Sequence, residues 1–413
     1  MAKHFISFLG IGIPEKGYKE VVYDNGEKTK FIQLHLIKEF CRDYTNDDRF
    51  TFFVTENARS TTWEPEDGLK YELAKLALKN LSNPIDITNI VDIGDGKTEK
   101  EIWGIFNKVY ENIRDDDLII FDVTHGFRSL PILAIVALNY ARTLKKFTLN
   151  KLYYGALEPG TDYGSVIDLT NFDLIYRWST AISDFNKYGT AGPIKDLLKN
   201  DAIDKVSKVL TTIRGQEIVS GKVFQKCKDY LVEYKYSRPY PPPFEPVFDL
   251  VETKLNAFKT DNPVGNIVAS IDWYIKHQLI QQGITMLREG ILTILISQAG
   301  CDYNDIELRD KCSTMIGHHN KERTNESERE LEESLQEGLQ KINSSAWYED
   351  CAKIYQSIKD IRNTVNHGGF TPKTTGGKKS MFFNAEEIIG KLQASFGNLK
   401  NTLREHKLWG DDI

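Results

Sequence analysis

Three residues of the types found in hydrolase triads lie close together in the segment FDVTHGFRSLP, namely Asp122, His125 and Ser129. A triad places the serine and the aspartate on opposite ring nitrogens of the histidine, and it usually draws these residues from distant parts of a chain. Spacings of three and four residues do not suit that geometry, and the Gly-x-Ser-x-Gly elbow is absent. The pattern therefore disfavours a triad, and Asp122 is instead expected to cap the end of a strand.

The same segment has the features of an anion-binding loop. An apolar helix pattern follows it directly, with Ser129 as a suitable N-cap and Pro131 in the first turn. The free N–H groups at the start of such a helix attract phosphate, and the fork-shaped guanidinium of Arg128 adds further donors. The sequence therefore predicts that this loop holds an anionic ligand.

Two other segments place glycine or polar residues after predicted strands. LGIGIPEKGY supplies Gly10 and Gly12, and VTENARST supplies Thr55 and Glu56. Ligands of open parallel sheets bind beyond the carboxyl ends of the strands, where glycine lets the backbone approach them closely. The glycines lack the G-x-G-x-x-G spacing, which disfavours a dinucleotide-dependent dehydrogenase.

A second chemically suited pair, Arg362 and His367, lies in the segment IRNTVNHGGF. The pattern predicts an amphipathic helix that ends at Gly368. Five residues correspond to ~140° around an ideal helix, so the two side chains do not share a face. They can converge through a distorted last turn, or when a second copy of the helix packs across a two-fold axis. Asn363, four residues before His367, does share its face.

An arginine and a histidine suit RNA cleavage without a metal ion. Histidine can move a proton near neutral pH during attack by a ribose 2′-hydroxyl, and arginine can stabilise charge on the phosphate in the transition state. The same two residue types are also common at helix ends, so the pair by itself is a short motif.

Cys301, Cys312, His318 and His319 superficially resemble a zinc-binding set, but the cysteine spacing is wrong for a zinc knuckle. We expect no metal site, with Cys312 packed in a helix and the two histidines in a polar loop. The charge-rich segment 320–338 is expected to be a solvated loop and helix face, or to border an entry for RNA.

Around these motifs, the first part of the chain alternates short apolar runs with helical patterns. This alternation predicts an α/β domain built on a mainly parallel sheet. Asn25 and Gly26, between two β-favouring runs, predict a hairpin. The predicted strands span residues 4–10, 49–56, 85–93, 117–123 and 151–157.

Helical patterns replace the strand pattern after about residue 180. The proline-rich segment 238–248 cannot be helical and is expected to be a stiff connector. Long amphipathic stretches at 266–299, 327–342, 347–366 and 384–405 predict a helical bundle. The expected organisation is an α/β domain at 1–180, a helical and proline-rich connector at 181–260 and an all-α domain at 261–413.

The composition is that of an ordinary globular protein. The chain has 413 residues, and its net charge of −6 argues against a generally basic nucleic-acid coat protein while leaving room for a local basic cleft. Its five scattered cysteines form no C-x-x-C pair, which favours reduced thiols. Because no signal peptide or membrane-spanning apolar stretch is evident, we expect a cytoplasmic protein with no membrane partner.

The segment DVTHGFRSLP resembles the D-x-T-H-G motif of a family of CRISPR-associated proteins, and the segments after the first two predicted strands are similar to those of the same family. The resemblance implies that residues 1–180 form a Rossmann-like CARF (CRISPR-associated Rossmann-fold) domain. Such a domain dimerises and binds a cyclic oligoadenylate made by the type III interference complex. The resemblance implies an activator pocket lined by Gly10, Gly12, Thr55, Glu56, Thr124, His125, Gly126, Phe127 and Arg128.

The segment RNTVNH resembles the R-x4–6-H motif of HEPN ribonucleases, and it follows the CARF-like region in the same chain. By this resemblance, Arg362 and His367 of two protomers form one composite site, with Asn363 supporting it. The implied protein is an endoribonuclease that cuts single-stranded RNA without a metal ion or cofactor after activation by a cyclic oligoadenylate. Cyclic tetra-adenylate is the family's commoner activator. A homodimer, or a higher oligomer of dimers, is the expected assembly.

Two other classes of function stay open from the sequence. The chain could be a non-catalytic nucleotide-sensing regulator whose helical domain binds a partner or DNA, which the net charge of −6 and the lack of a basic recognition helix disfavour. It could also be a nucleotide hydrolase that acts at the strand ends, including on its own activator. Both classes share the predicted fold and differ only in the chemistry at the two motifs.

Overall fold

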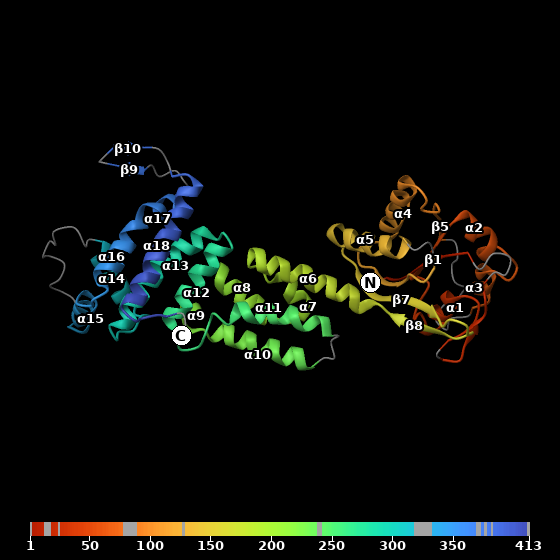
Figure 1. Cartoon of the computed structure of the whole chain (residues 1–413), viewed down its shortest axis with the longest axis horizontal. Helices are drawn as coiled ribbons and strands as arrows, with labels where there is room; N and C mark the ends of the chain where they lie inside the picture. Colours follow the sequence, from red (N-terminus) through yellow and green to blue (C-terminus); the bar gives the residue numbers. More distant parts are fainter. Residues whose placement is uncertain are drawn as a thin grey trace. The chain divides into compact units, whose positions relative to one another are not determined.

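The structure is a computed structural model, and it divides into two compact units, Met1–Tyr176 and Arg177–Ile413 (Figure 1). The predicted limits at residues 180 and 260 stay predictions. The residues that the structure describes are 2–11, 18–23, 25–76, 89–125, 129–237, 242–317, 333–368, 373–375, 378–380 and 383–410.

The first unit is built on a six-stranded sheet with the order β5-β4-β1-β6-β7-β8, in which only β8 runs antiparallel to its neighbour. All five predicted strands have counterparts, although residues 85–88 lie outside the described part. β8 was not predicted, because its five residues form too short an apolar pattern. The strands are β1 (Lys3–Leu9), β4 (Arg49–Val54), β5 (Ile90–Asp92), β6 (Leu118–Asp122), β7 (Thr148–Leu157) and β8 (Gly164–Asp168).

The hairpin predicted from Asn25 and Gly26 is present. Its strands are β2 (Val21–Val22) and β3 (Lys28–Thr29), and they pair antiparallel. Gly26 has a φ of +79°, a left-handed conformation that glycine adopts at no steric cost. The hairpin leads the chain from β1 into α1 (Ile32–Phe40) at the carboxyl ends of the parallel strands.

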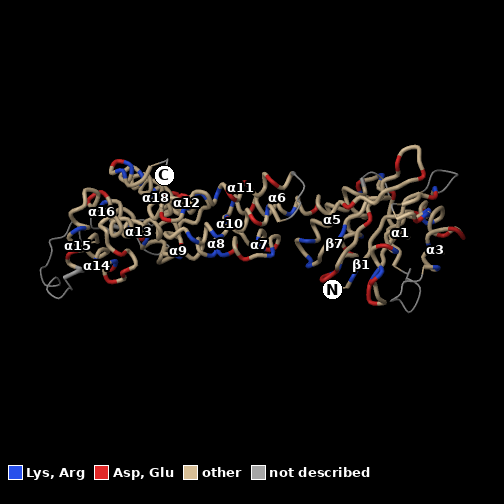
Figure 2. Tube along the Cα trace, turned by 90° about the horizontal axis from the view of Figure 1, so that it is seen from below, with Lys and Arg blue, Asp and Glu red and all other residues tan. Residues whose placement is uncertain are grey.

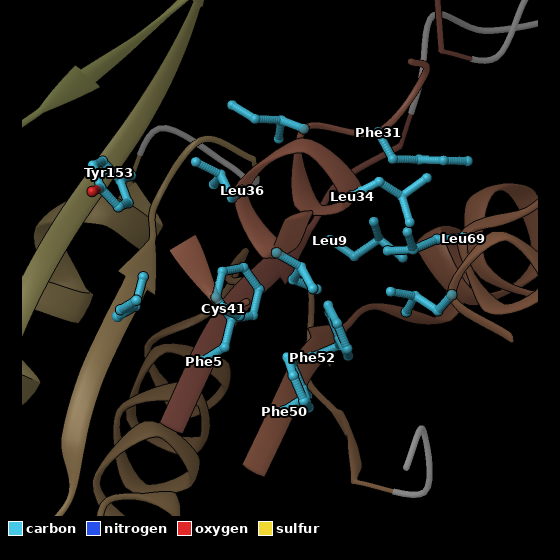
Figure 3. Close-up of a cluster of buried hydrophobic side chains, with 14 of the residues drawn as sticks. Phe5, Leu9, Phe31, Leu34, Leu36, Cys41, Phe50, Phe52, Leu69 and Tyr153 are labelled. Carbon is cyan, nitrogen blue, oxygen red and sulfur yellow. The ribbon is translucent and has the colours of Figure 1, made fainter. Parts of the chain in front are cut away.

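Helices cover both faces of the sheet, because alternate side chains of the central strands are apolar on both sides. On one face, Phe5 and Phe52 pack against α1 and α3 (Leu69–Lys75), as the labelled side chains in Figure 3 show. On the other face, Phe8 and Phe121 pack against α4 (Glu99–Asn112) and α5 (Ser129–Leu144). Each fully buried large apolar side chain contributes roughly 1.5–3 kcal/mol. The paired layers hold the strand ends in place.

The second unit is helical, as predicted, with one short hairpin, β9 (Lys373–Thr375) and β10 (Lys378–Ser380), that was not predicted. Lys and Arg residues are interspersed with Asp and Glu residues along its helices (Figure 2). The helices are α6 (Thr170–Tyr188), which begins in the first unit, then α7 (Gly192–Leu198), α8 (Ala202–Thr211), α9 (Gly215–Ser220), α10 (Lys222–Ser237), α11 (Glu245–Leu255), α12 (Pro263–Lys276), α13 (Ile280–Gln298), α14 (Ile306–Gly317), α15 (Glu333–Asn343), α16 (Tyr348–Ser357), α17 (Lys359–Asn366) and α18 (Ala385–Glu405).

The prediction that segment 238–248 is not helical is wrong for its second half. Residues Pro242–Phe244 form a short 3-10 helix, and α11 begins at Glu245 with Pro246 in its first turn, where a proline costs no helical hydrogen bond.

Two of the predicted helical stretches are interrupted. The stretch 266–299 breaks into α12 and α13 around Gln278, which has a φ of +56°. The stretch 347–366 breaks into α16 and α17 at Ile358. No helix in the described part of the chain is both long and apolar enough to cross a membrane.

Helix α13 forms the centre of the second unit. A Cβ atom on Gly290 would lie 2.5 Å from Ile267 of α12, and one on Gly283 would lie 2.9 Å from Leu392 of α18, so both neighbours pack closely against α13. Helix α17 packs on α13 and α16, with Ile361 and Thr364 buried. The central helix thereby fixes the position of the short helix that carries Arg362.

A buried polar cluster joins the amino-terminal ends of β1, β4 and β6. Arg49 Nη2 donates to Asp117 Oδ2 at 2.6 Å, and the Arg114 amide donates to the same oxygen at 2.8 Å. His4 is fully buried, with Nδ1 3.3 Å from Asp117 Oδ2 and Nε2 2.7 Å from Thr51 Oγ1. Burial alone raises the pKa of Asp117, but the hydrogen bonds from His4, the Arg114 amide and Arg49 outweigh it and hold the pKa below its ordinary value.

We expect Asp117→Asn to lower the free energy of unfolding by about 3 kcal/mol, because it leaves the buried ends of Arg49 and His4 without their anionic partner. A carboxyl whose pKa is depressed by folding stabilises the protein above its unfolded-state pKa of about 3.9 and loses this effect as the pH falls toward the folded-state pKa. The variant should therefore lose less stability than the wild type below pH 4. Denaturant titrations from pH 7 to pH 3 measure both effects.

The matched control is Asp116→Asn, because Asp116 is the exposed neighbour of Asp117 and its φ of 61° suits asparagine. We expect this control to stay within about 0.5 kcal/mol of the wild type. Equal losses in the two variants would show that the buried cluster does not stabilise the fold.

Candidate functional site

The carboxyl ends of β4, β1 and β6 lie side by side, because β1 pairs in parallel with both neighbours. Gly10 follows β1, Thr55 follows β4, and Thr124 and His125 follow β6. The structure thus brings these four predicted residues to one edge of the sheet, with exposed Glu56 next to Thr55. The other predicted pocket residues, Gly12, Gly126, Phe127 and Arg128, lie outside the described residues.

Thr55 is occupied in capping a helix. Its Oγ1 accepts from the Ala58 amide at 3.2 Å at the start of α2 (Glu56–Ala58), and the residue is 7% exposed. Arg59, in the following turn, donates through Nε to Asp92 Oδ1 at 2.9 Å. These bonds join the ends of β4 and β5 and set the path of the segment that follows β4.

Asp122 is fully buried and belongs to the framework of the strand ends. Its Oδ2 accepts from Ser7 Oγ at 2.7 Å, and its Oδ1 accepts from the Thr124 amide at 2.9 Å and from Thr124 Oγ1 at 2.5 Å. Burial raises the pKa of Asp122, whereas the hydrogen bonds from Thr124 and Ser7 favour its charged form. Both carboxylate oxygens are therefore engaged away from His125, which agrees with the sequence argument against a triad.

His125 is a half-buried imidazole at the start of the motif loop. Its ring meets the ring of Tyr18 edge to face, with centroids 4.8 Å apart. Removal from water lowers the pKa of His125 to about 4, so the ring is neutral at neutral pH. A neutral imidazole can donate a hydrogen bond to a nucleotide or accept one from it, but it adds no positive charge to the site.

Sequence reasoning missed three residues at this edge, namely Tyr18, Ser7 and Gln33. Tyr18 lines a small hollow together with Lys30, Phe31, Thr61, Thr62, Asp67 and Gly68. The sequence offered one hint about Ser7, because it is the single hydroxyl residue within the apolar run of β1. The sequence offered no hint about Gln33, because a polar residue in the first turn of a helix is ordinary.

The second candidate site lies at the end of α17. Arg362 and Asn363 are half-buried, His367 is exposed, and Arg362 Nη1 lies 3.4 Å from Asn363 Oδ1. The His367 amide donates to the Asn363 carbonyl at 3.0 Å, and Gly368 follows with a φ of 61°. The last helical residue is Asn366, and His367 caps the helix with a φ of −98° and a ψ of 21°, directly before the stop at Gly368 that the sequence predicted.

This helix end bears on how Arg362 and His367 could act together. The i-to-i−4 bond from the His367 amide keeps the two backbone positions roughly 140° apart around the helix axis. Of the two routes to convergence that the sequence left open, a distorted last turn is limited to the cap residue His367 itself. Pairing with a second copy of the helix is the route that this geometry favours.

Of the zinc-like set, the structure describes only Cys301 and Cys312. Cys312 is buried in α14, where burial raises the pKa of its thiol to about 12, and the Sγ of half-buried Cys301 lies 3.8 Å from the Ala299 carbonyl. His318 and His319 lie outside the described residues. Within those residues, no group of three or more His, Cys, Asp or Glu side chains is placed to hold a metal ion.

Three comparisons relate the chain to known proteins. Residues 4–158 match the family described as "CRISPR system endoribonuclease Csx1, CARF domain". "CRISPR-associated protein MJ1674" of Methanocaldococcus jannaschii is 33% identical over 111 residues, which are 26% of this chain and 18% of that protein. The chain thus matches less than a fifth of the length of this relative.

A solved structure, "Enterococcus italicus Csm6 bound to cyclic hexa-2′-fluoro-hexa-dAMP", aligns with 100% of this chain and 96% of its own, at 11% identity and a TM-score of 0.43. The profile match covers the strand ends described above and the motif at residues 122–126. Residues 4–158 thus form a CARF domain of the kind found in CRISPR-associated Csx1 endoribonucleases, as the D-x-T-H-G motif predicted.

Proposed function

We propose that this chain is an endoribonuclease of type III CRISPR defence, and that a cyclic oligoadenylate bound at the CARF domain activates it to cut single-stranded RNA. The observation that carries the proposal is the presence of both elements in one chain. A CARF domain with its ligand-facing strand ends precedes a helical unit in which Arg362 and His367 end a regular helix. The CARF match supports the sensing step, and the residue chemistry at α17 supports the cutting step.

The activator would lie across the strand ends of β1, β4 and β6. Helix α5 is 16 residues long and begins at Ser129, directly after the motif loop, so its first N–H groups are available to a phosphate. Arg128 would add positive charge, and Phe127 an aromatic surface for adenine. Gly10 and Gly12 would allow close approach, with Thr55, Glu56, Thr124, His125 and Gly126 completing the lining.

The cutting step would use the α17 helices of two protomers. His367 would take the proton from a ribose 2′-hydroxyl as its oxygen attacks the adjacent phosphorus, the bond from phosphorus to O5′ would break, and a proton would go to O5′. Arg362 would stabilise the charge that develops on the phosphate, and Asn363, 3.4 Å from it, would hold the guanidinium in place. No metal ion takes part in this scheme.

The exposed face of α5 supports the homodimer that a composite site needs. Ile132, Val136, Tyr140 and Leu144 recur every four residues and are 68%, 52%, 47% and 56% exposed. The opposite side of the helix packs on the sheet through Leu130, Ala134, Ala137, Leu138 and Ala141. A helix that is apolar on both sides is normally buried on both sides, so a second copy of this face is the partner that we propose.

The two alternative functions differ in the chemistry that they require at the strand ends and at α17. A hydrolase there needs an accessible acid, base or nucleophile, whereas Asp122 is fully buried and bonded to Ser7 and Thr124. A non-catalytic sensor needs no chemistry at Arg362 and His367. We favour the ribonuclease because both residue types required for RNA cleavage are present at the end of α17.

The decisive experiment incubates the full chain with labelled single-stranded RNA, with and without cyclic tetra- or hexa-adenylate, in the presence and absence of EDTA. We expect RNA cutting that depends on one of the two activators and persists in EDTA, because arginine and histidine supply the chemistry. Loss of the activator without RNA cutting would instead support the hydrolase. Activator binding with neither reaction would support the sensor.

We expect His367→Ala to reduce RNA cutting by about 10²- to 10⁴-fold, the usual contribution of a general acid or base, while activator binding is unchanged. The matched control is Asn366→Ala, because Asn366 is the exposed residue next to His367 and has no role in the scheme. Cleavage rates at saturating activator and calorimetric binding measure the two effects. Cutting by the His367 variant at the rate of the control would rule out this site.

We expect Val136→Glu to dissociate the dimer, because it places a charge in the middle of the apolar face of α5. Light scattering after size-exclusion chromatography gives the mass, and RNA cutting should fall together with the dimer fraction. Ile306→Glu is the matched control, since Ile306 is 83% exposed on α14. A dimer that survives the first change, or is lost equally in the control, would contradict the role of α5.

A further inference from the structure

A chain of buried hydrogen bonds connects four elements at the carboxyl ends of the strands. Ser7 and Asp122 stand opposite each other in the register of β1 and β6, and neither residue has any exposed surface. The Ser7 hydroxyl donates to Asp122 Oδ2 at 2.7 Å. Gln33, also fully buried in the first turn of α1, donates through Nε2 to Ser7 Oγ at 3.1 Å and to the Phe8 carbonyl at 3.3 Å.

The carboxylate of Asp122 connects Ser7 to the start of the motif loop. Its Oδ1 receives both the amide and the hydroxyl of Thr124, which bends the chain immediately after β6. Thr124 Oγ1 in turn accepts from the Gly155 amide of β7 at 2.7 Å. A Cβ atom on Gly155 would lie 1.9 Å from Ile32 Cδ1 and 3.2 Å from Thr124 Cγ2, so glycine is needed for the loop and α1 to approach β7 this closely.

The arrangement fixes the backbone at Thr124, where the motif loop begins. Asp122 offers two oxygens and receives three donors, two of them from Thr124, so Thr124 cannot move without breaking hydrogen bonds to a carboxylate that has no exposed surface. The direction in which the chain leaves β6 towards His125 is therefore set by Ser7 and Asp122, two side chains with no exposed surface.

We propose that Ser7 and Asp122, supported by Gln33, are positioning residues that set the affinity of the CARF domain for its anionic activator by fixing the loop that begins at Thr124. The proposal rests on the proposed function for the identity of the activator. It differs from a triad or any other catalytic role for Asp122, because the carboxylate acts through Thr124 and does not contact the ligand.

A purely structural role must be separated from this one, and the chain provides a matched control. On the neighbouring strand β4, Thr51 stands opposite Ile6, the residue before Ser7, and its Oγ1 bonds to His4 Nε2 at 2.7 Å and to Asn89 Nδ2 at 2.5 Å. Both Thr51 and His4 are fully buried. Thr51→Val removes one buried hydroxyl from the sheet, just as Ser7→Ala does, but one whose partners, His4 and Asn89, do not bond to Asp122 or Thr124. The two variants should therefore lose similar stability while differing at the strand ends.

The test compares full-length wild type, Ser7→Ala, Asp122→Asn and Thr51→Val. We expect the first two variants to bind cyclic tetra- or hexa-adenylate about tenfold more weakly, which corresponds to loss of one or two hydrogen bonds, and Thr51→Val to bind as the wild type does. In hydrogen-exchange mass spectrometry without ligand, peptides containing Thr124 and Gly155 should exchange faster only in the first two variants. Thermal unfolding gives the stability of each protein.

The proposal is overturned if Ser7→Ala and Thr51→Val change affinity equally, or if Ser7→Ala leaves exchange at Thr124 and Gly155 as in the wild type. The exchange measurement needs no ligand. If the wild type binds neither cyclic oligoadenylate, the proposed function fails while the exchange data still decide whether Ser7 holds the loop. Faster exchange confined to that loop then supports the positioning role for whatever anion the site takes.

Discussion

The strand-end site depends on one constraint: the carboxylate of Asp122, at the end of β6, is buried away from water. Asp122 has no exposed surface and burial raises its pKa, so its charged form depends on hydrogen-bond donors from the protein. Ser7 and Thr124 provide these donors, and through them the carboxylate determines the turn that follows the strand. The same turn brings His125 to the edge of the sheet and leads into α5. A side chain that looks catalytic in the sequence is in this way the anchor of the loop that we propose binds the activator.

Buried carboxylates stand at both ends of β6, and their surroundings give them different roles. Asp117, at the amino end, bonds to Arg49 and to the Arg114 amide and joins three strands. Asp122, at the carboxyl end, bonds to a loop that leads into a helix. In parallel sheets the carboxyl edge carries the ligand-facing loops, whereas the amino edge faces away from them. Location in the sheet, and not residue type, therefore separates a residue that stabilises the fold from one that shapes the site.

The sequence predicted those features that depend on local patterns. Alternating apolar runs located five strands, and Asn25 with Gly26 located the hairpin, because side-chain periodicity and turn geometry are properties of neighbouring residues. The pairing of Asp122 with Ser7 was out of reach, since the two residues lie 115 positions apart and a lone hydroxyl in an apolar run does not show which side chain it meets. The breaks at Gln278 and Ile358 were missed because the apolar pattern continues across both. The end of α17 was predicted, since Gly368 marks it.

Helix α5 joins the two requirements of the proposed enzyme. Its first residue, Ser129, directly follows the motif loop, and its exposed side carries Ile132, Val136, Tyr140 and Leu144. A ligand can favour one arrangement of two protomers only by binding that arrangement more tightly than the others. A helix that begins at the proposed ligand loop and continues as the proposed dimer face gives such a preference a direct physical route. Because Arg362 and the cap residue His367 lie roughly 140° apart around the axis of α17, cutting would then depend on the arrangement that the activator selects.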